Sequence, residues 1–222
     1  MNSILLPLTQ AASVSSEDGT WFNNTVIQEF LGTSIFETLA MTFVSGTLTI
    51  VFGLLLGLTL VTTGQRGQRP NPRLSWVLSQ IVNVGRSMPF IILLVALISV
   101  TRLIVGSSTG WQAVCVPLTI GAIPFYARLV ETAINDVDHG KVEAALMMGA
   151  SGLQITWGVL VREALPILIQ SATVTIITLL GYSAMAGAVG GGGVGDLAIQ
   201  YGYQRHQVDD CLLYPSPSPR DR

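Results

Sequence analysis

Uncharged, aliphatic stretches of the chain alternate with shorter segments that carry the charges. No Asp, Glu, Lys or Arg occurs over positions 38–65, 87–101 or 164–195, and a further apolar stretch covers 111–127. A helix needs about 20 mostly apolar residues to cross a bilayer, and in lipid its backbone must satisfy its hydrogen bonds internally. The pattern therefore predicts an all-α membrane protein with four spans, at about 38–65, 87–105, 111–127 and 165–188.

Glycines and prolines inside these stretches predict how the helices pack. Gly53 and Gly57 are four positions apart, a spacing typical of two helices that approach closely. We interpret the pair as packing within one bundle rather than as a dedicated dimer motif. Four prolines are expected at helix starts or kinks: Pro89, Pro117, Pro124 and Pro166.

The composition excludes several classes of function. Only 11% of the 222 residues are charged, whereas a typical soluble domain carries about 25%. The formal net charge of −2 offers no basic surface for nucleic acid, and two cysteines make neither a disulfide framework nor a metal quartet. No span contains a pair of His, Asp or Glu, as an intramembrane hydrolase would require. We expect no metal and no cofactor.

The placement of Lys and Arg predicts the orientation in the membrane. The first 37 residues contain acidic residues but no Lys or Arg. Cytoplasmic segments carry the excess of positive charge, so we expect the N-terminus outside and the segments 64–86 and 128–163 inside. Arg86 is expected at the inner boundary, where it either snorkels or lines a cavity. The cations of the two inner segments include Arg66, Arg69, Arg73, Arg128, Lys141 and Arg162.

The segment 128–163 contains a helix signal of its own. Good helix formers stand between Gly140 and Gly149, and a glycine can end a helix. We expect Glu143 in the first turn of this helix, where a carboxylate complements the helix dipole. Small and flexible apolar side chains then leave a face that either docks in a partner's groove or rests on the membrane interface. Spacing alone leaves both interpretations open.

The same residues resemble a motif of ABC-importer permeases. Glu143-Ala144-Ala145 with Gly149, followed by Val159-x-Val161, is similar to the "EAA" loop of that family. Arg162 departs from the pattern, because the family usually has proline there. The resemblance implies a coupling helix that docks in a groove of an ATP-hydrolysing subunit. The residues assigned to it are Glu143, Ala144, Ala145, Leu146, Gly149 and Ala150.

Longer runs resemble the permeases of bacterial methionine importers. They cover 36–46, 85–94, 181–190 and 193–203, and the match extends over about residues 36–205. The resemblance implies a type I ABC-importer permease bundle in the bacterial inner membrane that imports D- or L-methionine. The implied partners are a second copy of the permease, two ATP-binding subunits that hydrolyse the ATP, and an external methionine-binding lipoprotein. It also implies a gate made by Tyr182, Ser183 and Met185, with Met185 closing the pathway near the dimer axis.

Two alternatives remain. One is a permease for another polar amino acid, because no residue recognises a thioether chemically. The other is a self-contained channel or secondary transporter, which would need ionisable residues or a filter inside the membrane. The predicted spans offer only arginines at their boundaries.

The remaining segments flank the permease domain, which we place at 33–205. Residues 1–32 are expected to form a polar external extension, with a short helix from about Asn24 to Leu31. Gly190-x-Gly192-x-x-Gly195 matches a dinucleotide fingerprint but follows a span instead of a strand, so we expect an external turn with positive φ. Residues 206–222, rich in proline, are expected to be a non-native or frameshifted tail in place of a fifth helix.

Overall fold

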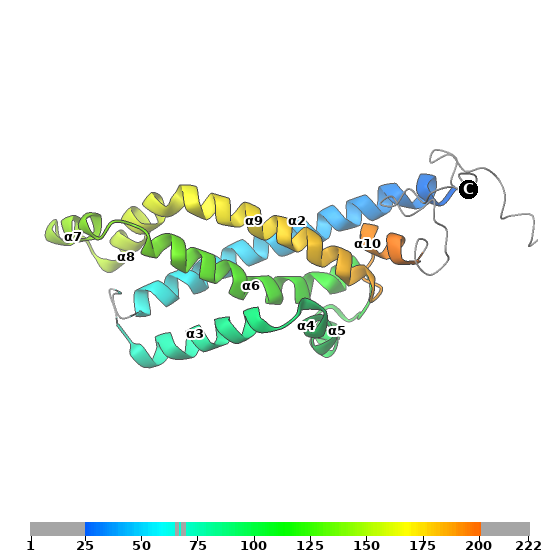
Figure 1. Ribbon diagram of the computed structural model, residues 1–222, viewed down its shortest axis with the longest axis horizontal. Helices are drawn as coiled ribbons and strands as arrows, with labels where there is room; N and C mark the ends of the chain where they lie inside the picture. The colour runs from blue at the N-terminus through cyan, green and yellow to red at the C-terminus, as the bar shows by residue number, and fades with distance from the viewer. Residues whose placement is uncertain (1–24, 65–66, 68–69, 201–222) are drawn as a thin grey trace, which may run out of the picture.

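The computed structural model describes residues 25–64, 67 and 70–200, and every regular element among them is helical. The long helices α2, α6 and α9 run along the same axis, and α3 lies beside α6 (Figure 1). The prediction of an all-α fold is therefore confirmed for the described residues. In chain order the helices are α2 Thr25–Thr63, α3 Pro72–Ser87, α4 Phe90–Ala96, α5 Ile98–Val105, α6 Trp111–Asn135, α7 His139–Met147, α8 Gly152–Gln154, the π-helix η3 Ile155–Leu160, α9 Val161–Gly187 and α10 Gly193–Leu197.

The most extensive helix contact joins α2 to α6, and two glycines make it possible. A methyl group on Gly53 would lie 2.8 Å from Tyr126 Cδ1, and one on Gly57 would lie 2.6 Å from Val130 Cγ1. Without Cβ atoms at these positions the two backbones approach closely. The interpretation of this pair as packing within the bundle is confirmed.

The second span differs from the prediction. Residues 72–87 form helix α3 instead of belonging to an inner loop, and a bend of 105° separates α3 from α4. Asn71 caps α3 by accepting a hydrogen bond from the Leu74 amide at 3.3 Å, and Pro89 precedes α4. The prediction of a loop over 64–86 and a span over 87–105 is wrong in these boundaries.

The third and fourth spans are longer than the uncharged stretches that predicted them. Helix α6 continues past Ala127 to Asn135 and contains both Pro117 and Pro124 in its interior. Helices α8, η3 and α9 follow one another directly from Gly152 to Gly187, with Pro166 in the second turn of α9. Three described helical stretches are long and apolar enough to cross a membrane, and the bent pair α3–α4 makes a fourth span if it counts as one.

The two ends of the chain lie largely outside the described residues. Helix α2 already begins at Thr25 and passes position 32 without a break, so the expected short helix at 24–31 is part of a much longer one. Residues 1–24 and 201–222, including the expected tail 206–222, are outside the described residues.

Buried residues form two clusters along the bundle. One surrounds Leu58, Val130 and Ile155 near α7, and the other surrounds Met41, Leu118 and Leu179 near α10. Buried hydroxyl groups follow the same helices, and several donate to the carbonyl four residues earlier, as Thr175 does to Ser171. Such bonds satisfy polar groups within a single helix.

The glycine contact between α2 and α6 can be tested with a matched pair of substitutions. Gly57→Ala forces a methyl group against Val130 and against the Ala127 carbonyl oxygen, which would be 2.8 Å away. We expect it to destabilise the protein by about 1–3 kcal/mol, measured as thermal unfolding in detergent.

Gly46→Ala is the control, because its methyl group meets the nearest side chain at an ordinary 3.6 Å. Both substitutions bring the same gain in helix propensity. Equal unfolding temperatures for the two variants would contradict the close-packing account.

Candidate functional site: a projecting helix and an opposite turn

Helix α7 is a separate short element at one end of the bundle. Asp138 Oδ1 accepts a hydrogen bond from the Gly140 amide at 2.8 Å and so caps its first turn. Gly149 follows its end with a φ of +80°, the left-handed conformation that commonly ends helices. The helix expected between Gly140 and Gly149 is therefore present. Glu143, however, lies one residue beyond the first turn, because the helix already begins at His139.

One side of α7 is attached to the bundle. Ala145 is 4% exposed and belongs to the buried cluster that contains Val130 and Ile155. Lys141 Nζ donates a hydrogen bond to Glu163 Oε1 of α9. Both of these charged side chains are about half exposed, so their ion pair adds less than about 1 kcal/mol and mainly sets the orientation of α7.

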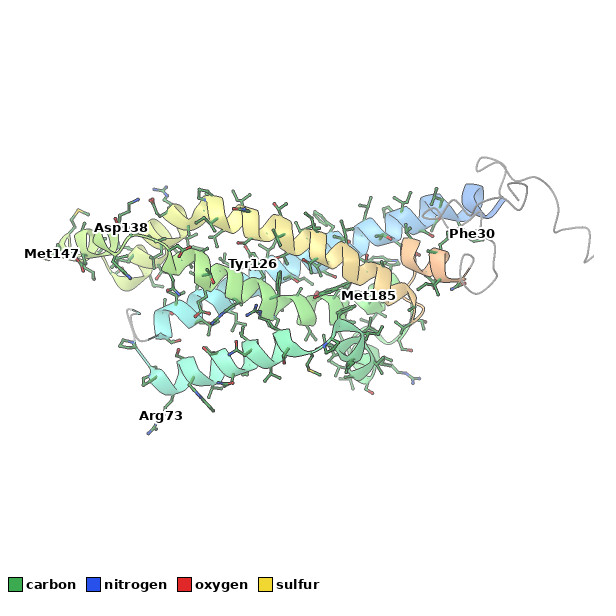
Figure 2. All side chains as sticks on the ribbon, viewed as in Figure 1. Phe30, Arg73, Tyr126, Asp138, Met147 and Met185 are labelled. Carbon is green, nitrogen blue, oxygen red and sulfur yellow. The ribbon has the colours of Figure 1, made fainter. Side chains whose placement is uncertain are left out.

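The other side of α7 is free and apolar. Leu146, Met147 and Met148 are 53%, 91% and 82% exposed, and Figure 2 shows Met147 at the extreme end of the molecule. Outside the lipid, exposed apolar side chains grouped at one site are typical of an interaction surface, and methionine adapts well to a partner. We call Leu146, Met147 and Met148 the apolar tip. Ala144 and Glu143 are also exposed, and Ala150 is half-buried.

A cleft of about 570 Å³ lies beside α7. Residues from the end of α2, the end of α6 and the start of α7 line it, among them Leu60, Asn135 and His139. Glu131, which also borders the cleft, pairs with Arg128 at 2.7 Å, as their spacing of three residues predicts. Among the described residues, no group of His, Cys, Asp and Glu could hold a metal ion.

The three residues expected to form the gate lie near the other end of α9. Met185 is 52% exposed, and it shares an open face of α9 with Gly181 and Ala184. Tyr182 instead stacks on Phe90, with ring centroids 4.5 Å apart. Ser183 is buried and donates to the Leu180 carbonyl at 2.7 Å. In this chain Met185 is thus the exposed member of the group, while Tyr182 and Ser183 pack within the bundle.

A glycine-rich turn follows Met185 and connects α9 to α10. Gly190, Gly192 and Gly193 have φ values of +75°, +76° and +78°. This confirms the expectation of positive φ for Gly190 and Gly192, whereas Gly195 lies in α10. Two residues of α2 hold this turn. Glu37 Oε2 accepts a hydrogen bond from the Gly193 amide at 2.8 Å, and Thr38 Oγ1 accepts one from the Val194 amide at 2.9 Å.

Sequence reasoning missed these attachments. Lys141 and Glu163 are 22 residues apart, and Glu37 and Gly193 are 156 apart, so no local pattern joins them. The only available signal was that Glu37 is the last charge before an uncharged stretch.

Helix α3 carries an arginine at each end. Arg86 belongs to the last turn of α3, whereas Arg73 lies at the opposite end of that helix, toward α7 (Figure 2). The neighbouring Gly85 faces Pro124 in the middle part of α6. The expectation that Arg86 lies at the inner boundary of the membrane stays a prediction.

Comparison with known proteins identifies the family. Residues 49–206 match the model of the binding-protein-dependent transport system inner membrane component. The chain belongs to this family. It is 50% identical over 191 residues to a probable D-methionine transport system permease protein MetI of Vibrio cholerae, with 83% of the chain and 85% of the relative covered. It is 54% identical over 153 residues to the D-methionine permease MetI of Escherichia coli K12, with 69% and 70% covered.

Solved structures agree with this membership. A chain of the MetNI methionine ABC transporter, in an inward-facing conformation, matches with a TM-score of 0.82 and 49% identity. That match covers 85% of this chain and 87% of the other. An amino acid ABC transporter crystallised with histidines matches at 19% identity and a TM-score of 0.63, which shows the shared fold alone. The predicted type I importer permease fold is confirmed.

The attachment of α7 can be tested at two adjacent alanines of this permease. Ala145→Leu places three extra carbon atoms in a buried site, so we expect a loss of about 1–3 kcal/mol in stability. Ala144→Leu places them on the exposed side and should leave the thermal unfolding in detergent unchanged. Equal losses in the two variants would contradict the assigned orientation of α7.

Proposed function

We propose that two copies of this chain form the membrane pathway of an importer for methionine, and that ATP hydrolysis on a separate subunit drives it. The apolar tip of α7 is the observation that carries the proposal. It is exposed in the bundle, and the chain shares 50% identity with a methionine permease. We further propose that an external methionine-binding lipoprotein delivers the substrate.

The coupling site follows from the two sides of α7. The buried side of α7 packs mainly against η3, which continues directly into α9, so a force on α7 acts on that helical stretch. The apolar tip offers a partner three side chains, and fully burying a Met or Leu stabilises a complex by about 1.5–3 kcal/mol. A partner that holds α7 in one of two positions can therefore favour one of two arrangements of the bundle. Glu143, Ala144 and Gly149 complete this docking surface.

Met185 is the residue we assign to the gate. Its flexible side chain stands on an open face of α9 beside Gly181 and Ala184, whose small size allows a second α9 to approach. Two copies of Met185 that meet across a dimer axis would close the pathway by apolar contact and separate when the helices move. Tyr182 supports the gate by stacking on Phe90 of α4, which holds this part of α9 in the bundle, and Ser183 is buried beside it.

The orientation follows from the same assignment. ATP is available in the cytoplasm, so α7 belongs on the inner side, together with Arg73 and Arg128. Positive residues near the inner ends of spans agree with this direction. Met185, α10 and the start of α2 then lie toward the outside.

A substrate other than methionine is the alternative to be tested. The same bundle would serve both hypotheses, which differ only in the amino acid that is taken up. Proteoliposomes that contain the assembled transporter should accumulate methionine only with ATP inside and the binding protein outside. Uptake of another amino acid in preference to methionine would replace the substrate, and uptake without ATP would contradict the proposed function itself.

The apolar tip provides the sharpest single-residue test. Met147→Glu puts a charge into a surface that has to become dry, so we expect loss of co-purification with the ATP-hydrolysing subunit and at least about a tenfold loss of uptake. Met147→Leu keeps the apolar volume and should behave like the parent. Since Met147 is 91% exposed, neither change should reduce the amount of folded permease in the membrane. Normal co-purification of the Glu variant would refute docking through the tip.

A further inference from the structure

Two side chains of helix α2 hold the turn between α9 and α10. Glu37 and Thr38 are consecutive residues of α2, and they accept hydrogen bonds from the consecutive amides of Gly193 and Val194. Thr38 also donates its hydroxyl hydrogen to the Ser34 carbonyl at 2.9 Å. Its oxygen is therefore oriented to accept. We call Glu37 and Thr38 the clamp.

The glycines of the turn are shaped to receive the clamp. A methyl group on Gly192 would lie 2.8 Å from Glu37 Oε2, and one on Gly193 would lie 2.6 Å from Thr38 Oγ1. Both glycines have positive φ, a conformation that other L-residues adopt at a cost. The backbone amides can reach the two side chains only because both positions lack a Cβ atom.

Helix α10, which the clamp holds, is in direct contact with Ala184, the residue before Met185. A methyl group on Gly195 would lie 2.5 Å from the Ala184 carbonyl oxygen and 2.7 Å from Ala184 Cα. One on Gly187 would lie 2.2 Å from the Asp196 amide nitrogen. Helix α10 is therefore in close backbone contact with the last turns of α9, and a shift of α10 has to move Ala184 or open this contact.

We propose that Glu37 and Thr38 are positioning residues for the gate, because they fix α10 against Ala184 and thereby fix Met185. This rests on the proposed function of Met185. The carboxylate of Glu37 makes the stronger of the two bonds, since a charged acceptor strengthens a hydrogen bond. The clamp also connects the gate to α2, which packs along α6 toward the end of the bundle that carries α7. A movement of α2 relative to α9 therefore reaches Met185 through two hydrogen bonds.

Two measurements on the transporter assembled in proteoliposomes separate the clamp from the gate. Hydrogen exchange at the amides of Gly193 and Val194 reports the clamp itself. Labelling of Met185→Cys by a membrane-impermeant maleimide, with and without ATP, reports the gate, and the chain without this cysteine provides the background from Cys115 and Cys211.

Glu37→Ala and Thr38→Val are the test variants. Each should speed exchange at its own amide partner and raise labelling at position 185 in the nucleotide-free state about tenfold, the factor expected from losing one such bond. Binding-protein-stimulated uptake should fall in parallel, while basal ATP hydrolysis continues. Glu37→Gln should restore most of the parent behaviour, because its amide oxygen can accept the same hydrogen bond.

Thr47→Val is the matched control. Thr47 lies on the same helix and donates to the carbonyl four residues earlier, as Thr38 does, at 2.8 Å from Phe43, but its side chain is exposed. It should change neither exchange nor labelling. Faster exchange in Glu37→Ala with parent-like labelling would overturn the proposal, and so would unchanged exchange. If the parent itself labels equally with and without ATP, the assignment of Met185 as the gate fails, and the positioning role fails with it.

Discussion

The close contact between α2 and α6 determines the arrangement of everything else in the bundle. In lipid, apolar side chains gain little from meeting one another, so helices associate through tight packing and hydrogen bonds. Gly53 and Gly57 supply that packing by letting two backbones meet beside Tyr126 and Val130. With α6 fixed against α2, both α3 and α9 pack on the remaining sides of α6. The two candidate functional ends are then held apart by long helices.

Short connections make this bundle suitable for transmitting movement. Three residues join α6 to α7, and four join α7 to α8, so α7 cannot shift without acting on both neighbours. Helices α8, η3 and α9 follow without a gap, and the rise from Gly152 to Met185 is about 50 Å at 1.5 Å per residue. A displacement at the apolar tip is thus applied to the same helical stretch that carries Met185. The π-helical segment η3 lies between them, and such segments are frequent at functional sites.

The sequence alone located the helices correctly where charged residues or helix-ending residues mark their limits. Three uncharged stretches located α2, α6 and α9, and Gly149 correctly marked the end of α7. It failed for α3, because Arg73 and Arg86 bound an uncharged stretch of only 12 residues, and Ser75, Ser79, Gln80 and Asn83 make that stretch polar. These polar residues are tolerated on a helix whose apolar positions recur with helical spacing. A search for uncharged stretches takes no account of the helical spacing of apolar residues.

The candidate site likewise has some features that the sequence predicts and others that it does not. The positions of the proposed coupling residues and of Met185 follow from local motifs, and the structure adds which of their neighbours are buried. The attachments that give those residues a fixed geometry link α7 to α9 and α2 to α10 across 22 and 156 residues. No local periodicity encodes such pairs, because each depends on how separate helices come together.

Both attachments involve a charged side chain at an end of the bundle, where water reduces the cost of burying charge. They differ in strength because water reaches them to different extents. The Lys141–Glu163 pair is about half exposed, so it is screened and can break when a partner moves α7. The Glu37 carboxylate is partly buried and receives a backbone amide whose geometry is fixed by two positive-φ glycines. A weak attachment at the proposed coupling end and a stronger one at the proposed gate end is the arrangement expected of a bundle that is moved from one side and held closed at the other.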